Sequence, residues 1–171
     1  MHDVGKTVTH VINEKGDHTY HGHDEAGAVL AEKILLGLKA DSHLIEAVKE
    51  MVDNHMKFRE VKEMRRSTLA RFMARPTFDD ELKLHWADCM SSNRNLDNYN
   101  YCLEMKDKVF VKAEEPKILS VITGDDLIHL GYVPGPLFKI LLKKTHDYMM
   151  DNSLTSKEEA IKYVKNWRWV Q

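Results

Sequence analysis

Apolar residues recur at helical spacing along most of the 171-residue chain. In residues 24–38 they stand three or four positions apart, which predicts an amphipathic α-helix. Residues 42–55 repeat the pattern, and their apolar face ends at His55. We therefore expect His55 on the core side of a helix that Ser42 caps. The apolar positions are Ala28, Leu30, Ala31, Ile34, Leu35 and Leu38 in the first segment and Leu44, Val48, Met51 and Val52 in the second.

Proline, glycine and capping residues mark the ends of the other predicted helices. Pro76 ends one helix, and Pro136 suits the first position of another. Thr123, with Asp126 three residues later, resembles a capping box, and Gly131 closes the helix that follows. The further predicted helices are residues 67–74, 78–92, 96–113, 125–130, 136–150 and 156–169.

The predicted fold class is therefore all-α, with at most one short β-hairpin. Residues 7–21 alternate loosely between apolar and polar, which predicts this hairpin or an irregular loop. Glu114–Lys117 is the clearest linker. It divides the chain into a helical domain at residues 1–113 and a C-terminal helical extension at residues 117–171.

Composition places the chain among globular proteins. Hydrophobic residues make up 43% and charged residues 30%, and no apolar run approaches the roughly 20 residues that span a bilayer. No secretory signal opens the chain. Cys89 and Cys102 form no CxxC pair, as expected of reduced thiols. These features predict a cytoplasmic protein that does not interact with membranes.

The net charge of −2 is unevenly distributed. Seven basic residues against Glu60 and Glu63 give residues 57–75 a local charge of +5, which leaves the rest of the chain acidic. A basic segment on an acidic chain favours an anionic partner such as phosphate. The alternative is a solvated helix surface. The seven residues are Lys57, Arg59, Lys62, Arg65, Arg66, Arg71 and Arg75.

Candidate metal chemistry begins at the first residues. His2 and Asp3 supply an imidazole and a carboxylate, a mixed donor set that divalent metals accept. We expect residues 1–4 to form the last turn of a helix that Gly5 ends, and Lys6 to offer its charge to a metal-bound phosphate. The HDxGK pattern is followed about twenty residues later by a GHDExGA segment, residues 22–28.

These two segments resemble the HD-domain superfamily of metal-dependent phosphohydrolases. Two further segments narrow the resemblance. Residues 62–72 are similar to a family pattern KxMRPSTLxRF, with Arg66 in place of Pro, and residues 123–138 fit TGDDLxxLGxxPGPxF. Together they resemble the HD and C-terminal helical region of bacterial tRNA nucleotidyltransferases and poly(A) polymerases, without the nucleotidyltransferase head. The implied domains are an HD helical bundle at residues 1–113, N-terminally truncated relative to the family, and the C-terminal extension.

The resemblance implies a set of site residues. A divalent metal (Mn, Ni, Mg, Fe or Zn) would polarise a phosphoryl oxygen and activate water. Lys6 would neutralise phosphate charge, and Asp24 or His85 would assist proton transfer. The implied substrate is a phosphomonoester or a cyclic phosphodiester of nucleotide origin. The implied metal ligands are His2, Asp3, His23, His55 and Asp88.

The chain departs from the family because the family's first metal-binding His lies on a helix before the HD pair. This departure implies an N-terminal truncation or incomplete metal binding. A separate alternative is that His2, His23 and Asp88 bind no metal and only hydrogen-bond inside the core. Missing helices would also leave an apolar face open, which a homodimer would cover. Without the head, we expect no nucleotidyl transfer by this chain alone.

Two functions from different classes remain. The first is a metal-dependent phosphohydrolase acting on a phosphate-containing small molecule or an RNA 3′ end. The second is a non-catalytic body that binds tRNA through phosphate contacts, which position RNA without reading its sequence. The implied RNA-binding residues are Arg65, Arg66, Arg71, Lys143 and Lys144.

Overall fold

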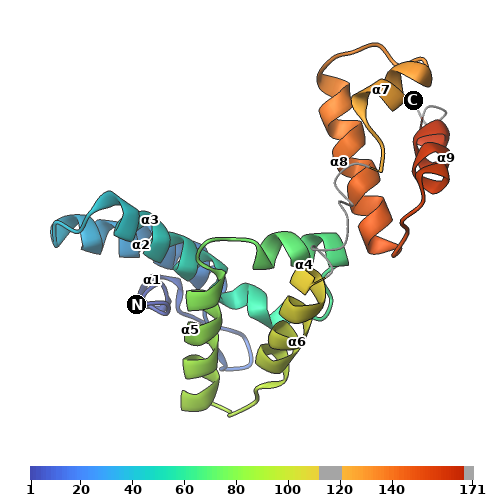
Figure 1. Cartoon of the computed structure of the whole chain (residues 1–171). Helices are drawn as coiled ribbons and strands as arrows, with labels where there is room; N and C mark the ends of the chain where they lie inside the picture. Colours follow the sequence, from blue (N-terminus) through green and yellow to red (C-terminus); the bar gives the residue numbers. More distant parts are fainter. Residues whose placement is uncertain (112–120, 168–171) are drawn as a thin grey trace. The chain divides into compact units, whose positions relative to one another are not determined.

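The computed structural model describes residues 1–111 and 121–167, and the side chains up to residue 108 and from residue 121 (Figure 1). The predicted linker Glu114–Lys117 and the end of the last predicted helix lie outside the described residues. The chain divides into two compact units, described separately below. The N-terminal unit comprises Met1–Glu63 and Phe72–Glu104; the C-terminal unit comprises Met64–Arg71 and the residues from Met105 onward.

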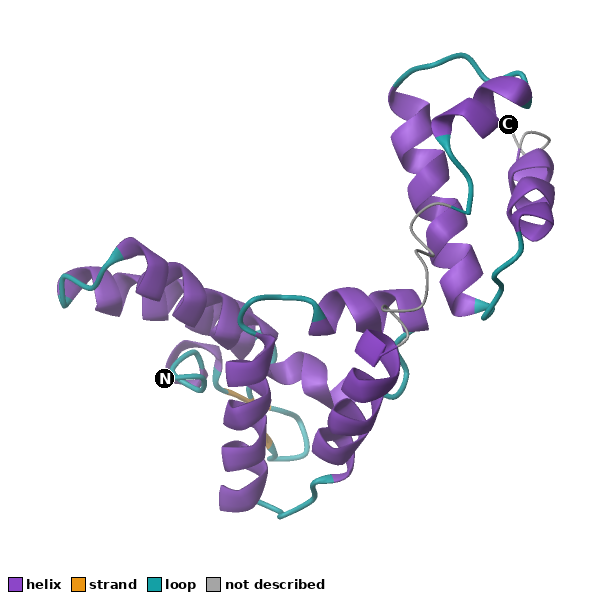
Figure 2. Cartoon of the chain, viewed as in Figure 1, coloured by secondary structure: helices purple, strands orange, loops and turns teal. Residues whose placement is uncertain are grey.

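Helices dominate both units, and the prediction of an all-α fold with one short hairpin is confirmed (Figure 2). Strands β1 and β2 pair antiparallel, with Val11 opposite Thr19 and Ile12 opposite His18. The elements are α1 (Lys6–Thr9), β1 (Val11–Ile12), β2 (His18–Thr19), α2 (His23–Gly37), α3 (Ser42–Asn54), the 3-10 helix η1 (His55–Glu60), α4 (Arg66–Met73), α5 (Phe78–Ser91), α6 (Asp97–Val111), α7 (Gly124–His129), α8 (Pro136–Asp151) and α9 (Lys157–Trp167).

The N-terminal unit is built on the helical hairpin of α2 and α3, which lie side by side (Figure 1). Their shared core consists of Ala28, Ala31 and Val52. Beyond this hairpin, the rings of Phe58, Phe72 and Phe78 pack together with centroids 5.1 to 5.9 Å apart. Small residues at the α2–α3 contact let the two helices approach closely, and the aromatic cluster fixes η1.

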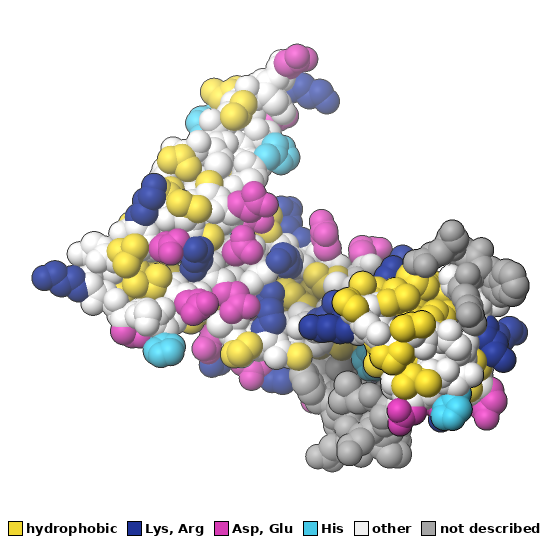
Figure 3. Space-filling view, turned by 90° about the horizontal axis from the view of Figure 1, so that it is seen from above, with side chains coloured by type: hydrophobic (Ala, Val, Ile, Leu, Met, Phe, Trp, Pro, Cys, Tyr) yellow, Lys and Arg dark blue, Asp and Glu magenta, His cyan; other side chains and the backbone are white. Residues whose placement is uncertain are grey.

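The C-terminal unit has a core of its own around α7, α8 and α9. Its fully buried residues include Leu127, Leu141, Met149 and Val164. Figure 3 shows hydrophobic side chains gathered on one exposed face of this unit. Large exposed apolar residues of this unit include Ile128, Val133 and Ile140.

Helix caps follow the sequence closely in the C-terminal unit. The predicted capping box is present: the Asp126 N–H donates to Thr123 Oγ1, and the Thr123 N–H donates to Asp126 Oδ2. Gly131 adopts a left-handed φ of +82° after α7, and Pro136 opens α8. These predictions are confirmed.

Two predictions near the N-terminus are wrong. Residues 2–5 form turns instead of the last turn of a helix, and α1 begins at Lys6, immediately after the glycine that was expected to end a helix. Ser42 does not cap α3; Asp41 does, because its carboxylate accepts the Leu44 N–H. Among the described residues, no helix combines the length and apolar character that crossing a membrane requires.

Candidate metal centre

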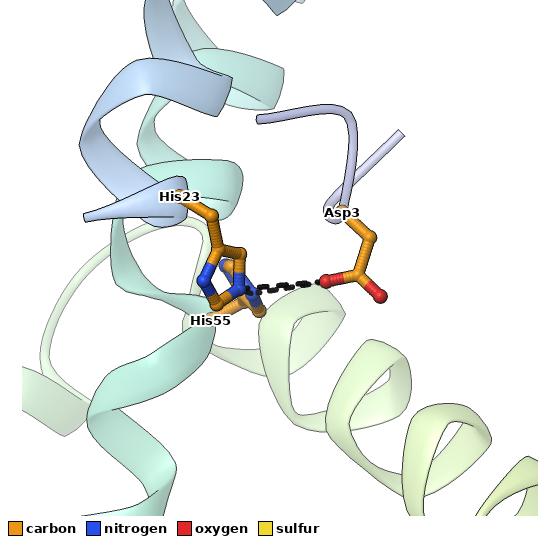
Figure 4. Close-up of side chains that lie close together, drawn as sticks. All are labelled: Asp3, His23 and His55. Atoms are coloured by element: carbon orange, nitrogen blue, oxygen red, sulfur yellow. Dashed lines mark hydrogen bonds and ion pairs between the residues drawn. The ribbon is translucent and has the colours of Figure 1, made fainter. Parts of the chain in front are cut away.

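Three elements of the N-terminal unit bring Asp3, His23 and His55 together (Figure 4). Asp3 lies in the turn before α1, His23 is the first residue of α2, and His55 is the first residue of η1. The side chain of His55 is 8% exposed, so it faces inward as expected. Residues 20 to 52 positions apart in sequence thus supply donor atoms that all lie within 4.8 Å of one another.

Glycines make this approach of the N-terminal turn to α2 possible. A Cβ on Gly5 would lie 2.0 Å from the carbonyl oxygen of His23 and 2.6 Å from the Gly27 nitrogen. Gly5 has right-handed helical dihedral angles, so its role is close backbone contact and not a left-handed helix end. The glycines of the two sequence motifs therefore pack against each other, and this contact sets Asp3 beside His23.

The ring nitrogens of the two histidines face each other. His23 Nε2 lies 3.1 Å from His55 Nε2. Asp3 Oδ1 lies 3.4 Å from His23 Nε2 and 3.9 Å from His55 Nε2. Figure 4 shows the carboxylate of Asp3 pointing at this pair of nitrogens.

Backbone carbonyls determine which ring nitrogen carries the proton. Nδ1 of His23 lies 2.8 Å from the Tyr20 carbonyl oxygen, and Nδ1 of His55 lies 2.6 Å from that of Val52. A carbonyl only accepts, so each Nδ1 is the donor and each neutral ring presents a lone pair at Nε2. Two lone pairs and a carboxylate pointing at one another repel unless a cation lies between them. Two imidazoles and a carboxylate fit a divalent metal ion.

Electrostatics around the cluster favour the metal-binding protonation states. Burial raises the pKa of the Asp3 carboxyl, but Lys6 and the nearby His2 and His23 outweigh it and hold that pKa below its ordinary value. Lys6 Nζ lies 2.7 Å from Asp3 Oδ2. Burial is the main cause that lowers the pKa of His55, so its ring favours the neutral form that metals bind.

The two remaining predicted ligands lie beside the three-residue cluster. His2 Nε2 is 3.5 Å from Asp3 Oδ2 and 3.7 Å from Asp88 Oδ1. Its ring also packs edge-on against His55, with centroids 5.5 Å apart. His2 thus connects Asp88 on α5 to the cluster.

The three predicted catalytic residues line one cavity of about 820 Å³ together with the cluster. They are Lys6, Asp24 and His85. The His85 ring stacks on Phe58 at 4.8 Å, and burial lowers the pKa of this histidine. A half-buried, neutral imidazole can accept a proton at the cavity wall.

Tyr20, Arg59 and Lys62 also line this cavity. The sequence analysis named Arg59 and Lys62 in the basic segment that favours an anionic partner, but it did not place them at this site, and it missed Tyr20. Arg59 stands four residues after His55, and this spacing is a signal that could have placed it here. Tyr20 precedes the GHDExGA segment and is fixed through its carbonyl contact with His23.

The predicted RNA-binding residues are in different environments within the C-terminal unit. Arg71 Nη1 donates to Asp147 Oδ1 at 2.6 Å, and Arg66 donates to the Ser153 hydroxyl. Arg65 is exposed, as are Lys143 and Lys144. Arg66 and Arg71 thus contact α8 or the residue two positions beyond its end, although Arg71, like Arg65, Lys143 and Lys144, is exposed.

Comparisons with known proteins give two distant relatives. The chain is 27% identical over 176 residues to an A-adding tRNA nucleotidyltransferase of Deinococcus radiodurans, covering 98% of this chain and 40% of that protein. It is 25% identical over 170 residues to a CC-adding tRNA nucleotidyltransferase of Thermus thermophilus, covering 98% and 38%. No family model matches the chain, and no solved structure matches it significantly.

The chain is therefore a distant homologue of tRNA nucleotidyltransferases, and that part of the sequence-based resemblance is confirmed. It spans about two-fifths of the length of the curated relatives it matches.

Proposed function

We propose that Asp3, His23 and His55 form an HD-type divalent-metal centre that hydrolyses a phosphomonoester or cyclic phosphodiester, in a protein related to tRNA processing. One observation carries the proposal: two Nε2 lone pairs face each other at 3.1 Å beside a carboxylate. Distant homology to tRNA nucleotidyltransferases over 98% of the chain supports the link to RNA.

The metal would polarise a phosphoryl oxygen and lower the pKa of a bound water. The residues of the chain supply the rest of the chemistry. Lys6, already held beside Asp3, neutralises phosphate charge from the cavity wall. His85 and Asp24 line the same cavity and exchange protons with water and the leaving group. His2 contacts both Asp3 and Asp88. It thereby orients the Asp3 carboxylate and brings Asp88 beside the cluster, where Asp88 can join the metal ligands.

The donor set narrows the choice of metal. Imidazole suits Zn, Fe and Ni, whereas Mg prefers an all-oxygen shell. We therefore rank Fe, Ni and Zn above Mn and Mg among the divalent candidates.

Turnover by the whole chain tests the proposal. Bis(p-nitrophenyl) phosphate and p-nitrophenyl phosphate are assayed with each metal for the wild type, Asp3→Asn and the control Asp17→Asn, an aspartate in the exposed hairpin. The proposal predicts metal-dependent hydrolysis that Asp3→Asn lowers at least about 100-fold. Loss of a metal ligand should reduce activity at least as much as loss of a residue that only supports a ligand. Equal rates in the wild type and Asp3→Asn would contradict it.

A second candidate is a non-catalytic body that binds tRNA. The homologous region includes the C-terminal unit, whose exposed Arg65, Lys143 and Lys144 are suited to phosphate contacts. Salt-sensitive tRNA binding without turnover by the metal centre would favour this candidate.

We also propose that the N-terminal unit self-associates. Val29, Leu36, Leu38 and Leu44 on and beside the α2–α3 hairpin are between 47% and 70% exposed. Burying them in a homodimer would remove apolar surface from water. Light scattering should give a dimer that Leu36→Lys dissociates; a wild-type monomer would rule the dimer out.

A further inference from the structure

We infer that Arg59 and Lys62 form a second anion subsite in the cavity of the metal centre. The site then takes a nucleotide with a further phosphate one sugar away from the phosphate that reacts. This inference rests on the proposed phosphohydrolase function and specifies its substrate class.

The first step concerns the charge left over in the basic segment. Four of its seven cations have partners: Asn54 for Lys57, Ser153 for Arg66, Asp147 for Arg71 and Glu81 for Arg75. The side chains of Arg59, Lys62 and Arg65 make no hydrogen bond or ion pair with any residue that the structure describes. Of these three, Arg59 and Lys62 line the cavity of the metal centre. Within the N-terminal unit, the two cations of this segment that have no partner, Arg59 and Lys62, therefore both lie in the cavity of the metal centre.

The second step concerns the position of Arg59. Arg59 and His55 belong to the same 3-10 helix, η1. Asn98 fixes this helix because its amide donates to the carbonyl oxygens of Phe58 at 2.9 Å and Arg59 at 3.2 Å. A rise of about 2.0 Å per residue puts the Arg59 backbone roughly 8 Å along the axis from His55. The backbone of Arg59 is thus held at a set distance from the metal ligands, and its guanidinium is free to bind an anion in the cavity.

The third step is the chemistry that fits this spacing. The two phosphates of a diphosphate share one oxygen atom, so they lie closer together than two phosphates that bind separately at the metal ligands and at Arg59. Phosphates on opposite sides of one ribose are separated by the sugar. A guanidinium binds a phosphate through two parallel hydrogen bonds, so Arg59 suits the second group.

The cavity wall also suits a nucleobase. His18 and Tyr20 line it, and the His10 ring stacks on both, with centroids 4.8 and 5.3 Å away. Flat aromatic rings at a cavity edge are stacking surfaces for bases. A nucleoside 3′,5′-bisphosphate, or the 3′ end of an oligonucleotide, therefore fits better than a sugar phosphate.

Equilibrium binding tests the subsite independently of turnover. Calorimetry on the whole chain, with EDTA present so that neither nucleotide is hydrolysed, compares adenosine 3′,5′-bisphosphate with adenosine 3′-monophosphate. We expect the wild type to bind the bisphosphate about tenfold more tightly, since a hydrogen-bonded charge pair at a partly solvated site has that order of effect. Arg59→Ala and Lys62→Ala should abolish the preference and leave monophosphate affinity unchanged. Lys33→Ala, an exposed lysine on α2, serves as the matched control.

The outcomes separate the subsite from the proposed function. Equal wild-type affinity for the two nucleotides, no binding of either, or an equal loss for both in Arg59→Ala would overturn the subsite. Hydrolysis of adenosine 3′-monophosphate, measured on the same proteins with manganese, reports on the phosphohydrolase itself. Preference for the bisphosphate without hydrolysis would uphold the subsite and overturn the hydrolase.

Discussion

At the scale of single residues, the candidate centre depends on where hydrogen bonds place protons. Both histidines commit Nδ1 to a backbone carbonyl, so both direct Nε2 to the same point. Either a metal ion or one additional proton relieves the resulting repulsion. Because burial lowers the pKa of His55, neutral pH favours the metal ion.

Gly5→Ala should disrupt the centre without changing any proposed ligand. The new methyl group would overlap the His23 carbonyl, and overpacking of this kind costs about 1–3 kcal/mol. We expect this loss of stability in urea unfolding together with weaker metal binding. Gly37→Ala is the control, since nothing lies within 4 Å of its Cβ position. Wild-type metal affinity in Gly5→Ala would show that the close contact is dispensable.

A second prediction at this scale concerns the buried carboxylate of Glu81. Its side chain is 0% exposed and pairs with Arg75 and the Thr77 hydroxyl. Burial is the largest influence on its pKa, which lies above the ordinary value. Glu81→Ala leaves Arg75 without this partner, so the free energy of unfolding should fall by about 3 kcal/mol. Lys83→Ala, which breaks the exposed pair with Asp80, should leave it unchanged. Equal effects would contradict the prediction.

The family resemblance named the three residues of the cluster, but the sequence did not give the reason for the glycine beside them. The HDxGK and GHDExGA segments identified Asp3 and His23, and the apolar face of residues 42–55 oriented His55. The contact between Gly5 and α2 joins residues about twenty positions apart, and no local rule predicts it. His2 and Asp88 lie beside the cluster because α5 approaches the N-terminal turn, which spacing along the chain does not specify.

At the scale of elements, capping chemistry was predictable where the cap is local. The Thr123–Asp126 box, Gly131 and Pro136 each act within a few residues, and all three predictions hold. The 3-10 helix η1 was missed because its geometry is stabilised by distant contacts: Asn98 holds its carbonyls and Phe72 packs on Phe58.

The capping box of α7 should make the C-terminal unit sensitive to acid. The Lys157 ammonium, with the Thr123 N–H, lowers the pKa of Asp126 from 3.8 to about 2. A folded pKa below the unfolded one means that this stabilisation is fully present above pH 4 and is lost as the pH falls towards 2. Asp126→Asn should therefore lower stability at pH 7 and weaken the loss between pH 4 and 2.

Urea unfolding at pH 7, 4 and 2.5, followed by circular dichroism, measures this effect. Asp125→Asn, which changes the neighbouring carboxylate, is the matched control. An unchanged acid response in Asp126→Asn would show that another group dominates.

At the scale of the whole molecule, the two units have separate cores and separate candidate surfaces. The sequence predicted a basic segment, but it did not predict which residues its charged side chains contact. Arg66 and Arg71 find partners 87 and 76 residues further along the chain, and such pairings depend on the tertiary fold.

The metal centre and the candidate RNA surface should respond independently to mutation. Lys143→Ala with Lys144→Ala should weaken tRNA binding and reduce its salt dependence, because each lost phosphate contact reduces counterion release. The same double variant should keep wild-type metal affinity, and Asp3→Asn should keep wild-type tRNA affinity. Filter binding between 50 and 200 mM salt measures the first effect. Loss of both properties in either variant would contradict this independence.

The most direct test of the metal centre is the metal stoichiometry of the whole chain. Untagged protein is purified without added metal, its content is determined by mass spectrometry, and manganese, nickel and zinc are titrated by calorimetry. His23→Gln is compared with His43→Gln, an exposed histidine on α3. We predict about one metal per chain in the wild type and His43→Gln, and binding weaker by about 100-fold or more in His23→Gln. No metal in the wild type, or equal affinity in His23→Gln, would contradict a metal centre built on Asp3, His23 and His55.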